Sequence, residues 1–250
     1  MLTEEQLAEY RAEGFLNSIT VHSSAQADQV RAGFNELEER EGKEHCQIGL
    51  QGRHIDLKFI WELATCPNIL DCMESLLGPD IMLLSTHVFC KYPDPSVTRF
   101  VAWHQDVTYW GLEPPEATTA WYAIDDADVE NGCMRVIPRT HLAGITEHGK
   151  SERAGNLLSI NQEVQTEIDE STAIDLAMKA GQISIHDGFL IHGSGPNGSN
   201  RRRCGVTIRY CRPNVKPARE NSIKTPWPSM IVRGEDRYGH FGEWELKFDS

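Results

Sequence analysis

The chain has 250 residues, of which 40% are hydrophobic and 24% charged, values typical of a folded protein with ample length to bury a core. Its formal net charge of −13 argues against nucleic acid as a partner, because a phosphate backbone is bound by a basic surface. A small-molecule substrate stays open, since a pocket can carry the opposite sign to the surrounding surface.

Helical patterns occupy the first 80 residues. Thr3 and Gln6 have the spacing of a capping box, which predicts a short helix that ends at Gly14. Apolar residues at helical spacing predict two further helices, Ser24–Glu41 and Pro67–Leu77.

Short strand-like segments begin at residue 81, where β-branched and aromatic runs alternate with glycine, proline, asparagine and aspartate. Helices followed by many short strands predict an α+β protein, with a jelly-roll core and flanking N-terminal helices. The candidate strands are Ile81–Lys91, Arg99–His104, Thr118–Ile124, Cys133–Ile137, Gln182–His186 and Cys204–Arg212.

We expect the whole chain, residues 1–250, to form a single domain. A polar insertion over residues 143–180 contains one predicted helix near Glu170–Lys179. The other expected parts are a helical flank (1–80), the jelly-roll core (81–212) and an irregular C-terminal tail (213–250).

Seven cysteines are scattered along the chain without a CxxC pair. Such an odd, irregular set indicates reduced thiols rather than a disulfide framework. The acidic start lacks the features of a signal peptide, and no apolar run approaches the length of a membrane span. We therefore expect a cytoplasmic protein, monomeric or homodimeric, that binds a small molecule and neither nucleic acid nor membrane.

A histidine and an aspartate stand two positions apart at the end of one predicted strand. His104 and Asp106 would project from the same face, because side chains alternate along a strand. One imidazole and one carboxylate make two thirds of the facial triad of non-haem Fe(II) oxygenases. Taken alone, the pair is more often a surface histidine beside a capping aspartate than part of a metal site.

A second histidine and an arginine extend this pattern. His192 follows an apolar strand and turn, and Arg203 opens another strand eleven residues later. The planar guanidinium suits the remote carboxylate of a dicarboxylate co-substrate whose 2-oxo acid end chelates the metal. Ser194 can donate a hydroxyl to the same carboxylate. Together these residues predict an Fe(II)- and 2-oxoglutarate-dependent oxygenase.

Three stretches of the sequence resemble the phytanoyl-CoA dioxygenase family of Fe(II)/2-oxoglutarate oxygenases, and the chain is also similar to ectoine hydroxylase within it. They are AWHQDVTYWGL, TAWYAIDDADVENGCMRVIPRTH and IHGSGPN followed by RRRCGVTIRY. The resemblance covers roughly Leu2 to Arg212. It implies a double-stranded β-helix, a cupin-like jelly roll, with Fe(II), 2-oxoglutarate and O₂ as the reactive partners.

The same resemblance assigns the site residues. Asp106 favours oxygen insertion over halogenation, because halogenating relatives have a small residue in its place. Relatives commonly have Gly-Ser-His where this chain has Arg139-Thr140-His141, a loop that we expect to be structural. The implied iron ligands are His104, Asp106 and His192, and the implied 2-oxoglutarate contacts are Arg203, Ser194, Trp121 and His87.

Two cationic residues are candidate substrate contacts. Arg209 shares the strand alternation of Arg203 and should also face inward, where it meets either a structural carboxylate such as Asp187 or a substrate anion. Lys91 is either a rim charge in solution or a substrate contact.

Aromatic residues and a third histidine lie near the metal pair in sequence. Tyr109 and Trp110 are either core aromatics or walls of the substrate pocket. His186 is expected to pack beside the site, on the strand that faces His192 in a short hairpin.

These residues predict a dioxygenase that hydroxylates an unactivated C–H bond of a small metabolite and releases succinate and CO₂. The cluster of His87, Lys91 and Arg209 favours an anionic or zwitterionic substrate such as an aminoalkylphosphonate. The alternatives are a halogenase or other oxidative tailoring enzyme of a natural-product pathway, and a non-catalytic jelly-roll binding protein. The joint presence of metal and co-substrate residues argues against the last.

Overall fold

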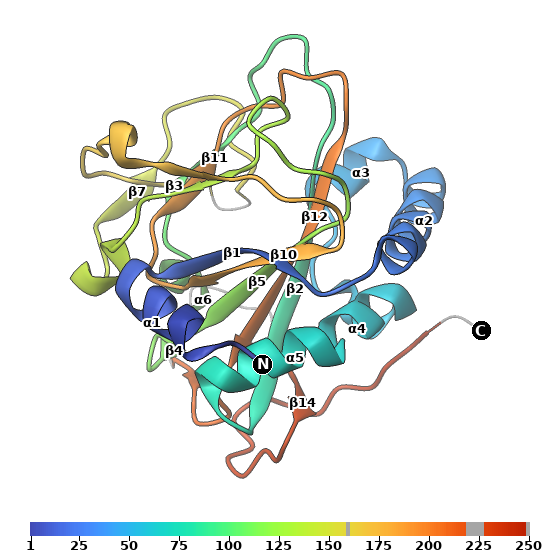
Figure 1. The fold of residues 1–250 in the computed structure, drawn as a ribbon, viewed down its shortest axis with the longest axis vertical. Coiled ribbons are helices and arrows are strands. Elements are labelled where there is room, and N and C mark those ends of the chain that lie inside the picture. The colour runs from blue at the N-terminus through green and yellow to red at the C-terminus, as the bar shows by residue number, and fades with distance from the viewer. Residues whose placement is uncertain (159–160, 219–227, 249–250) are drawn as a thin grey trace.

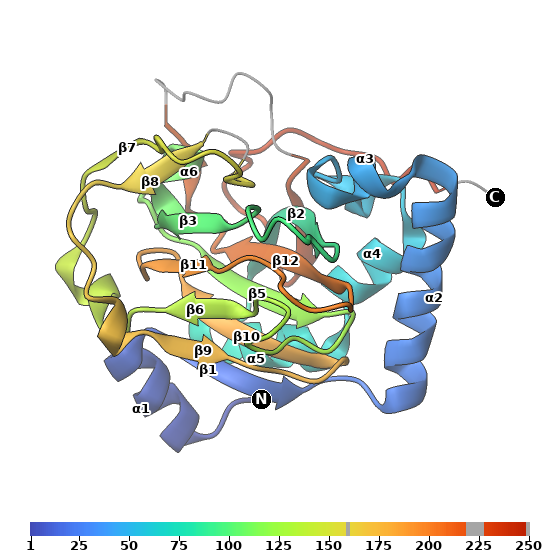
Figure 2. The same ribbon diagram turned by 90° about the horizontal axis from the view of Figure 1, so that it is seen from above.

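The computed structural model of the chain describes residues 1–158, 161–218 and 228–248. Within these ranges two antiparallel sheets face each other, and N-terminal helices cover the outer side of the larger sheet (Figure 1, Figure 2). The predicted α+β jelly roll with flanking N-terminal helices is confirmed.

Among the described residues the larger sheet has six strands, in the order β1-β10-β5-β12-β2-β14, and the smaller has four, in the order β3-β11-β6-β9. Two short pairs, β4 with β13 and β7 with β8, lie outside these sheets. The bounds are β1 Phe15–Thr20, β2 Ile81–Lys91, β3 Val101–His104, β4 Leu112–Glu113, β5 Thr118–Ala123, β6 Met134–Val136, β7 His148–Lys150, β8 Gln162–Val164, β9 Ile174–Leu176, β10 Gln182–Asp187, β11 His192–Ser194, β12 Arg203–Cys211, β13 Lys216–Pro217 and β14 Met230–Arg233.

The N-terminal helices follow the sequence signals closely. The Thr3 side chain accepts from the Gln6 backbone N–H in the predicted capping box, and Gly14 ends the helix at φ 87°. Two other helices have the predicted bounds, whereas two short α-helices between them were not predicted. The α-helices are α1 Glu4–Glu13, α2 Ser24–Glu41, α3 Lys43–Ile48, α4 Lys58–Ala64, α5 Pro67–Leu77 and α6 Val107–Trp110.

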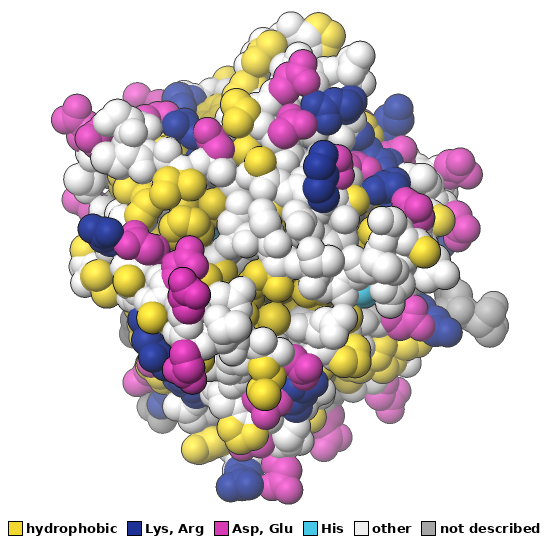
Figure 3. All heavy atoms as spheres, viewed as in Figure 1, with side chains coloured by type: hydrophobic (Ala, Val, Ile, Leu, Met, Phe, Trp, Pro, Cys, Tyr) yellow, Lys and Arg dark blue, Asp and Glu magenta, His cyan; other side chains and the backbone are white. Residues whose placement is uncertain are grey.

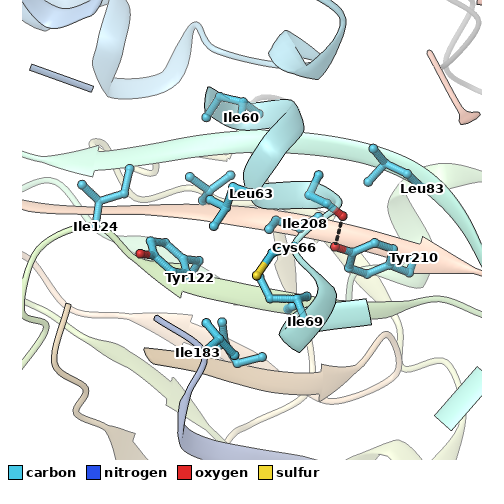
Figure 4. Close-up of a cluster of buried hydrophobic side chains, with 14 of the residues drawn as sticks. Ile60, Leu63, Cys66, Ile69, Leu83, Tyr122, Ile124, Ile183, Ile208 and Tyr210 are labelled. Carbon is cyan, nitrogen blue, oxygen red and sulfur yellow. Dashed lines mark hydrogen bonds between the residues drawn. The ribbon is translucent and has the colours of Figure 1, made fainter. Parts of the chain in front are cut away.

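The main apolar core lies between these helices and the outer face of the six-stranded sheet. Figure 4 shows Ile60, Leu63 and Ile69 of the helical layer against side chains of the strands. The Tyr210 hydroxyl donates to the Ala64 carbonyl oxygen at 2.8 Å and so links β12 to α4. Each fully buried aliphatic side chain contributes about 1.5–3 kcal/mol to stability, so this layer holds the sheet rigid behind its inner face.

A β-bulge in β2 decides which of its side chains face inward. Tyr210 pairs with Leu83 but Arg209 pairs with Ser85, so Leu84 is an extra residue in this ladder. Before the bulge the odd-numbered Leu83 faces the helices. After the bulge the even-numbered residues, beginning with Thr86 and Val88, face the helices instead. The bulge thus turns Ser85 and the alternate residues that follow it toward the space between the sheets.

Two segments differ from expectation. The predicted helix near Glu170–Lys179 is wrong: a single 3-10 turn, Glu170–Thr172, is followed by β9, which pairs with β6. Non-local pairing overrides the local helical preference here. The N-terminal flank also contributes a strand that was not predicted, β1, which extends the larger sheet beside β10.

The remaining features of the fold are the cysteine thiols, the hydropathy of the helices and the distribution of surface charge. All seven cysteines, which lie within the described ranges, are buried, and none forms a disulfide. No helix in the described part of the chain is both long and apolar enough to cross a membrane. On the face shown in Figure 3, basic and acidic side chains are interspersed.

Candidate active site

Three predicted ligands meet between the two sheets. His104 ends β3, Asp106 follows it at the start of α6, and His192 begins β11, which pairs with β3 so that the two histidines are direct partners. Asp106 Oδ1 lies 3.7 Å from His104 Nε2 and 3.9 Å from His192 Nε2. All three ligand atoms lie within 4.8 Å of one another, and all three residues are buried.

Local bonds fix which nitrogen each histidine presents. Nδ1 of His104 lies 2.8 Å from the Ala102 carbonyl oxygen, and Nδ1 of His192 lies 3.0 Å from that of Leu190. A carbonyl can only accept, so Nδ1 carries the proton and Nε2 offers a lone pair. Three acceptor atoms therefore converge in a buried space, an arrangement that fits a divalent cation such as Fe(II).

The second oxygen of Asp106 is held by the larger sheet. Oδ2 accepts a hydrogen bond of 2.9 Å from the Thr119 hydroxyl on β5. His186 Nε2 lies 3.4 Å from this oxygen and Arg209 Nε lies 3.9 Å from it. Asp106 thus directs one oxygen to the metal position while the other is anchored.

These contacts correct two expectations. The convergence of His104 and Asp106 does not come from strand alternation, because β3 ends at His104 and Asp106 has helical φ and ψ angles. The carboxylate beside Arg209 is Asp106 and not Asp187. In the register of the sheet Arg209 pairs with Thr119, which pairs with His186, so Asp187 points to the opposite face.

The surroundings set the protonation states that a metal requires. Burial raises the pKa of the Asp106 carboxyl, but Arg209 and the histidines His186 and His192 outweigh it and hold that pKa well below its usual range. Burial, reinforced by His104 and His186, holds the pKa of His192 well below its ordinary value, and burial also lowers the pKa of His104. A charged carboxylate and two neutral imidazoles are the metal-binding forms.

Thr119→Val should weaken metal binding by about 10–100-fold, because it removes the donor that orients Asp106 while keeping the side-chain shape. Calorimetric titration of the purified protein with Zn(II) measures this effect. Thr118→Val is the matched control, since Thr118 is the next residue on β5 and contacts Tyr10 instead. Equal metal affinities for the two variants would contradict the orienting role of Thr119.

A second cluster consists of two cations and a hydroxyl, and two of its members, Arg203 and Ser194, line the same pocket. Lys91 and Arg203 are paired residues on β2 and β12, and both are buried. Lys91 Nζ donates to Ser194 Oγ at 2.6 Å and also to the Gly195 carbonyl oxygen. Arg203 Nε donates to the Gly132 carbonyl oxygen at 3.0 Å. The expectation that Lys91 is a rim charge in solution is therefore wrong.

The electrostatics of this cluster suit an anion. Burial, followed by repulsion from Arg203, holds the pKa of Lys91 well below its usual value. Because Lys91 donates to the Ser194 oxygen, the Ser194 hydroxyl proton remains available to another acceptor. Within the described residues, the terminal nitrogens of the Arg203 guanidinium have no hydrogen-bond acceptor, so its fork can take a carboxylate.

Trp121 lines the wall between the two clusters. Its indole packs closely against β12 at Gly205, where an added Cβ would come within 2.1 Å of the ring. The Arg203 guanidinium carbon lies 5.0 Å from the centre of this ring, a cation–π contact. The glycine is therefore required for the close approach of indole and strand.

The other residues that the sequence predicted near the site are His87, Tyr109, Trp110 and His186, and the structure supports only some of these predictions. His87 lines the pocket, and Trp110 does so as a fully buried wall. The side chain of Tyr109 lies outside the described part of the structure. His186 packs beside the site, with its ring 4.4 Å from that of His192. The predicted hairpin is wrong, however, because β10 belongs to the larger sheet and β11 to the smaller.

Sequence reasoning missed the role of the residue between the first two ligands. Gln105 is fully buried, and its amide nitrogen donates to the carbonyl oxygens of Gly144 and Phe189. Its backbone N–H donates to Nε2 of His148 at 3.1 Å. Gln105 thus fastens the polar insertion beside the metal position. No signal in the sequence indicated this role, because Gln105 stands between two other polar residues, His104 and Asp106.

Comparison with known proteins completes the description of the site. The sequence model of the phytanoyl-CoA dioxygenase (PhyH) family matches residues 1–205. The chain belongs to this family. Its histidine-aspartate-histidine cluster is in place to receive a metal ion such as Fe(II).

Curated members of the family match at moderate identity. Peroxisomal phytanoyl-CoA dioxygenase from Bos taurus is 29% identical over 157 residues, which cover 62% of this chain and 47% of the bovine protein. A probable alpha-ketoglutarate-dependent hypophosphite dioxygenase from Stutzerimonas stutzeri is 25% identical over 186 residues, which cover 74% and 64%. The chain spans about half the length of the mammalian relatives that it matches.

Solved structures share the fold. The apo form of the non-heme monooxygenase ThoJ has a TM-score of 0.79 and 28% identity, with 96% of this chain and 87% of that chain covered. The epimerase SnoN in complex with Fe³⁺, alpha ketoglutarate and nogalamycin RO has a TM-score of 0.74 and 21% identity, with 92% and 98% covered. At that identity the second likeness supports the jelly-roll fold alone.

Proposed function

We propose that this dioxygenase hydroxylates an unactivated C–H bond of a small anionic or zwitterionic metabolite, such as an aminoalkylphosphonate. The observation that carries the proposal is the presence, in one buried pocket, of three metal-directed acceptors and a separate cluster of cations. Bound Fe(II) and 2-oxoglutarate supply the oxidising power from O₂, with succinate and CO₂ as the co-products.

The metal roles go to the three converging residues, His104, Asp106 and His192. Their Nε2 and Oδ1 atoms occupy one side of the metal position, which leaves the other side open to the pocket. The backbone bonds of the two histidines and the Thr119 bond of Asp106 keep these atoms aimed at one point. Such preorganisation spares the enzyme the cost of ordering its ligands when the metal binds.

The co-substrate role goes to the second cluster. Arg203 presents a planar fork to the remote carboxylate of 2-oxoglutarate, and Ser194 adds a hydroxyl donor. Lys91 supports this grip by holding Ser194 in place, so we assign it to the co-substrate end of the pocket rather than to the substrate. Trp121 and His87 form the walls that confine the co-substrate between Arg203 and the metal.

Oxygen insertion is favoured over halogenation by Asp106. Its carboxylate would occupy the coordination site that a halide needs, and its Oδ2 is fixed by Thr119, so the side chain cannot swing away without losing that bond. A screen of products for chlorine tests the alternative. The triad and the cation cluster likewise favour an enzyme over a jelly-roll protein that only binds a ligand.

The substrate class follows from the interior charges and from the relatives. The cations lining the pocket attract an anion although the protein as a whole is acidic. The name of the Stutzerimonas stutzeri relative points to a small phosphorus oxyanion for that protein. The finer likeness to ectoine hydroxylase stays a prediction, as do the cytoplasmic location and the monomeric or homodimeric state.

Anaerobic addition of Fe(II) and 2-oxoglutarate should give a weak visible absorption band, which requires both components. Adding candidate substrates with O₂ should then accelerate succinate release, and aminoalkylphosphonates and other small zwitterions belong first in that screen. A protein that binds neither Fe(II) nor 2-oxoglutarate would contradict the proposed function. Zn(II) in place of Fe(II) is the control, since it fills the site without giving the band.

A further inference from the structure

A row of polar side chains crosses the inner face of the larger sheet. Ser85, Arg209, Thr119 and His186 are successive partners across β2, β12, β5 and β10. Thr119 is accounted for by its bond to Asp106. Ser85 and Arg209 stand at the other end of the row, and both line the pocket.

Arg209 is a buried cation without a hydrogen-bond acceptor in the described part of the chain. Its side chain is 10% exposed, and its Nε is buried and unbonded, 3.9 Å from Asp106 Oδ2. The guanidinium carbon lies 5.2 Å from the centre of the Trp110 ring, which supports one face of the group but satisfies none of its N–H donors. The Ser85 hydroxyl beside it is likewise buried and unbonded.

The charges in the pocket leave Arg209 to share its one nearby carboxylate, Asp106, with the metal position. Asp106 is the only acidic side chain among the described residues that line the pocket. Bound Fe(II) and the two carboxylates of 2-oxoglutarate cancel each other, and one carboxylate of Asp106 cannot balance both Arg203 and Arg209. A buried guanidinium whose N–H donors have no acceptor is costly, so a further anion would complete the site.

We propose that Arg209 and Ser85 form the subsite for the anionic group of the primary substrate, a compact carboxylate or phosphonate. The fork of Arg209 takes two oxygens of this anion, and the Ser85 hydroxyl donates to one of them. This inference rests on the proposed function, because it assumes that 2-oxoglutarate fills the Arg203 cluster.

The position of the subsite also limits the size of the substrate. Arg209 lies beside the carboxylate of a metal ligand, so an anion held there is close to the metal position. The carbon that is oxidised must therefore lie only a few bonds from the anionic group. A long acyl chain with a distant carboxylate would not place a reactive C–H bond correctly.

The test is a calorimetric titration of anaerobic enzyme, loaded with Fe(II) and saturated with 2-oxoglutarate, using methylphosphonate and propionate as probes. One probe should bind, and the ratio of the two affinities distinguishes a phosphonate site from a carboxylate site. Arg209→Gln should weaken that binding about tenfold or more, and Ser85→Ala about threefold, with 2-oxoglutarate affinity unchanged. Arg212→Gln is the matched control, because Arg212 pairs with Glu116 on the exposed surface.

Ser85→Ala and Arg209→Lys keep the test decisive if Arg209→Gln fails to fold or to retain metal. Ser85 has no bond to lose, and lysine keeps the charge but not the fork. The inference is overturned if the wild-type enzyme binds neither probe or if these variants bind the probes as the wild type does. It is also overturned if a probe binds only to enzyme without 2-oxoglutarate and is displaced when 2-oxoglutarate is added. If the wild-type enzyme does not bind 2-oxoglutarate at all, that result would instead overturn the proposed function itself.

Discussion

Replacing Asp106 by alanine is expected to reduce succinate formation to background. The substitution removes the only charged side chain among the three predicted ligands, and its Oδ1 lies 3.7 Å from His104 Nε2 and 3.9 Å from His192 Nε2. Since loss of a mere orienting partner weakens metal binding about 10–100-fold, loss of a ligand should weaken it by more than about 100-fold. His192→Ala should have the same effect. Metal content and succinate release, measured on the purified variants, check both expectations.

Two exposed residues serve as controls for these variants. Asp175→Ala removes a carboxylate that pairs with Arg135 on the smaller sheet, and His45→Ala removes an imidazole that lies on the surface. Both should retain activity within about twofold, because surface substitutions have small effects. Turnover at the wild-type rate in Asp106→Ala or His192→Ala would remove the basis of the iron assignment. Thermal unfolding of each variant shows whether a lost activity comes from a lost fold.

Arg203→Gln is expected to weaken 2-oxoglutarate binding by about 10–100-fold, because hydrogen bonds to a charged group are worth roughly 1.5–3 kcal/mol. Metal affinity should stay close to wild type, since Arg203 lies away from the three ligands. Arg203→Lys should rescue little, because an ammonium does not reproduce the planar fork and would stand beside Lys91. Calorimetric titration with 2-oxoglutarate in the presence of Zn(II) gives the affinities.

Arg201→Gln provides the comparison for this experiment. Arg201 is exposed and pairs with Asp128 and Glu130, so its loss should leave 2-oxoglutarate binding unchanged. An Arg203→Gln variant with wild-type affinity would mean that the remote carboxylate is held elsewhere. Arg209 would then be the first candidate for holding that carboxylate. The affinity of the double variant Arg203→Gln/Arg209→Gln for 2-oxoglutarate would test this role.

Much of the site could be predicted because its chemistry is concentrated in short stretches of sequence. His104 and Asp106 are two residues apart, and the sequence places Arg203 just beyond the turn that follows His192. The helices α2 and α5 were equally accessible, since capping and apolar spacing are local signals.

What could not be predicted depends on register between strands that are distant in sequence. Lys91 can be buried because Ser194 Oγ, on the other sheet, and the Gly195 carbonyl oxygen accept hydrogen bonds from its Nζ. The partner of Arg209 follows from the pairing of β12 with β5 and β10, which places His186 and not Asp187 on its face. No local pattern reports such a register, because it is set when the sheets assemble.

Asp106 joins the two sheets. It follows a strand of the smaller sheet, yet its Oδ2 is bonded to Thr119 of the larger one. A metal ion on His104, Asp106 and His192 can therefore bind only when the sheets are packed together, and the unfolded chain offers no such site. By mass action, iron and its co-substrate shift the folding equilibrium toward the native state. The supply of iron would then set how much folded protein persists, as well as the catalytic rate of the enzyme.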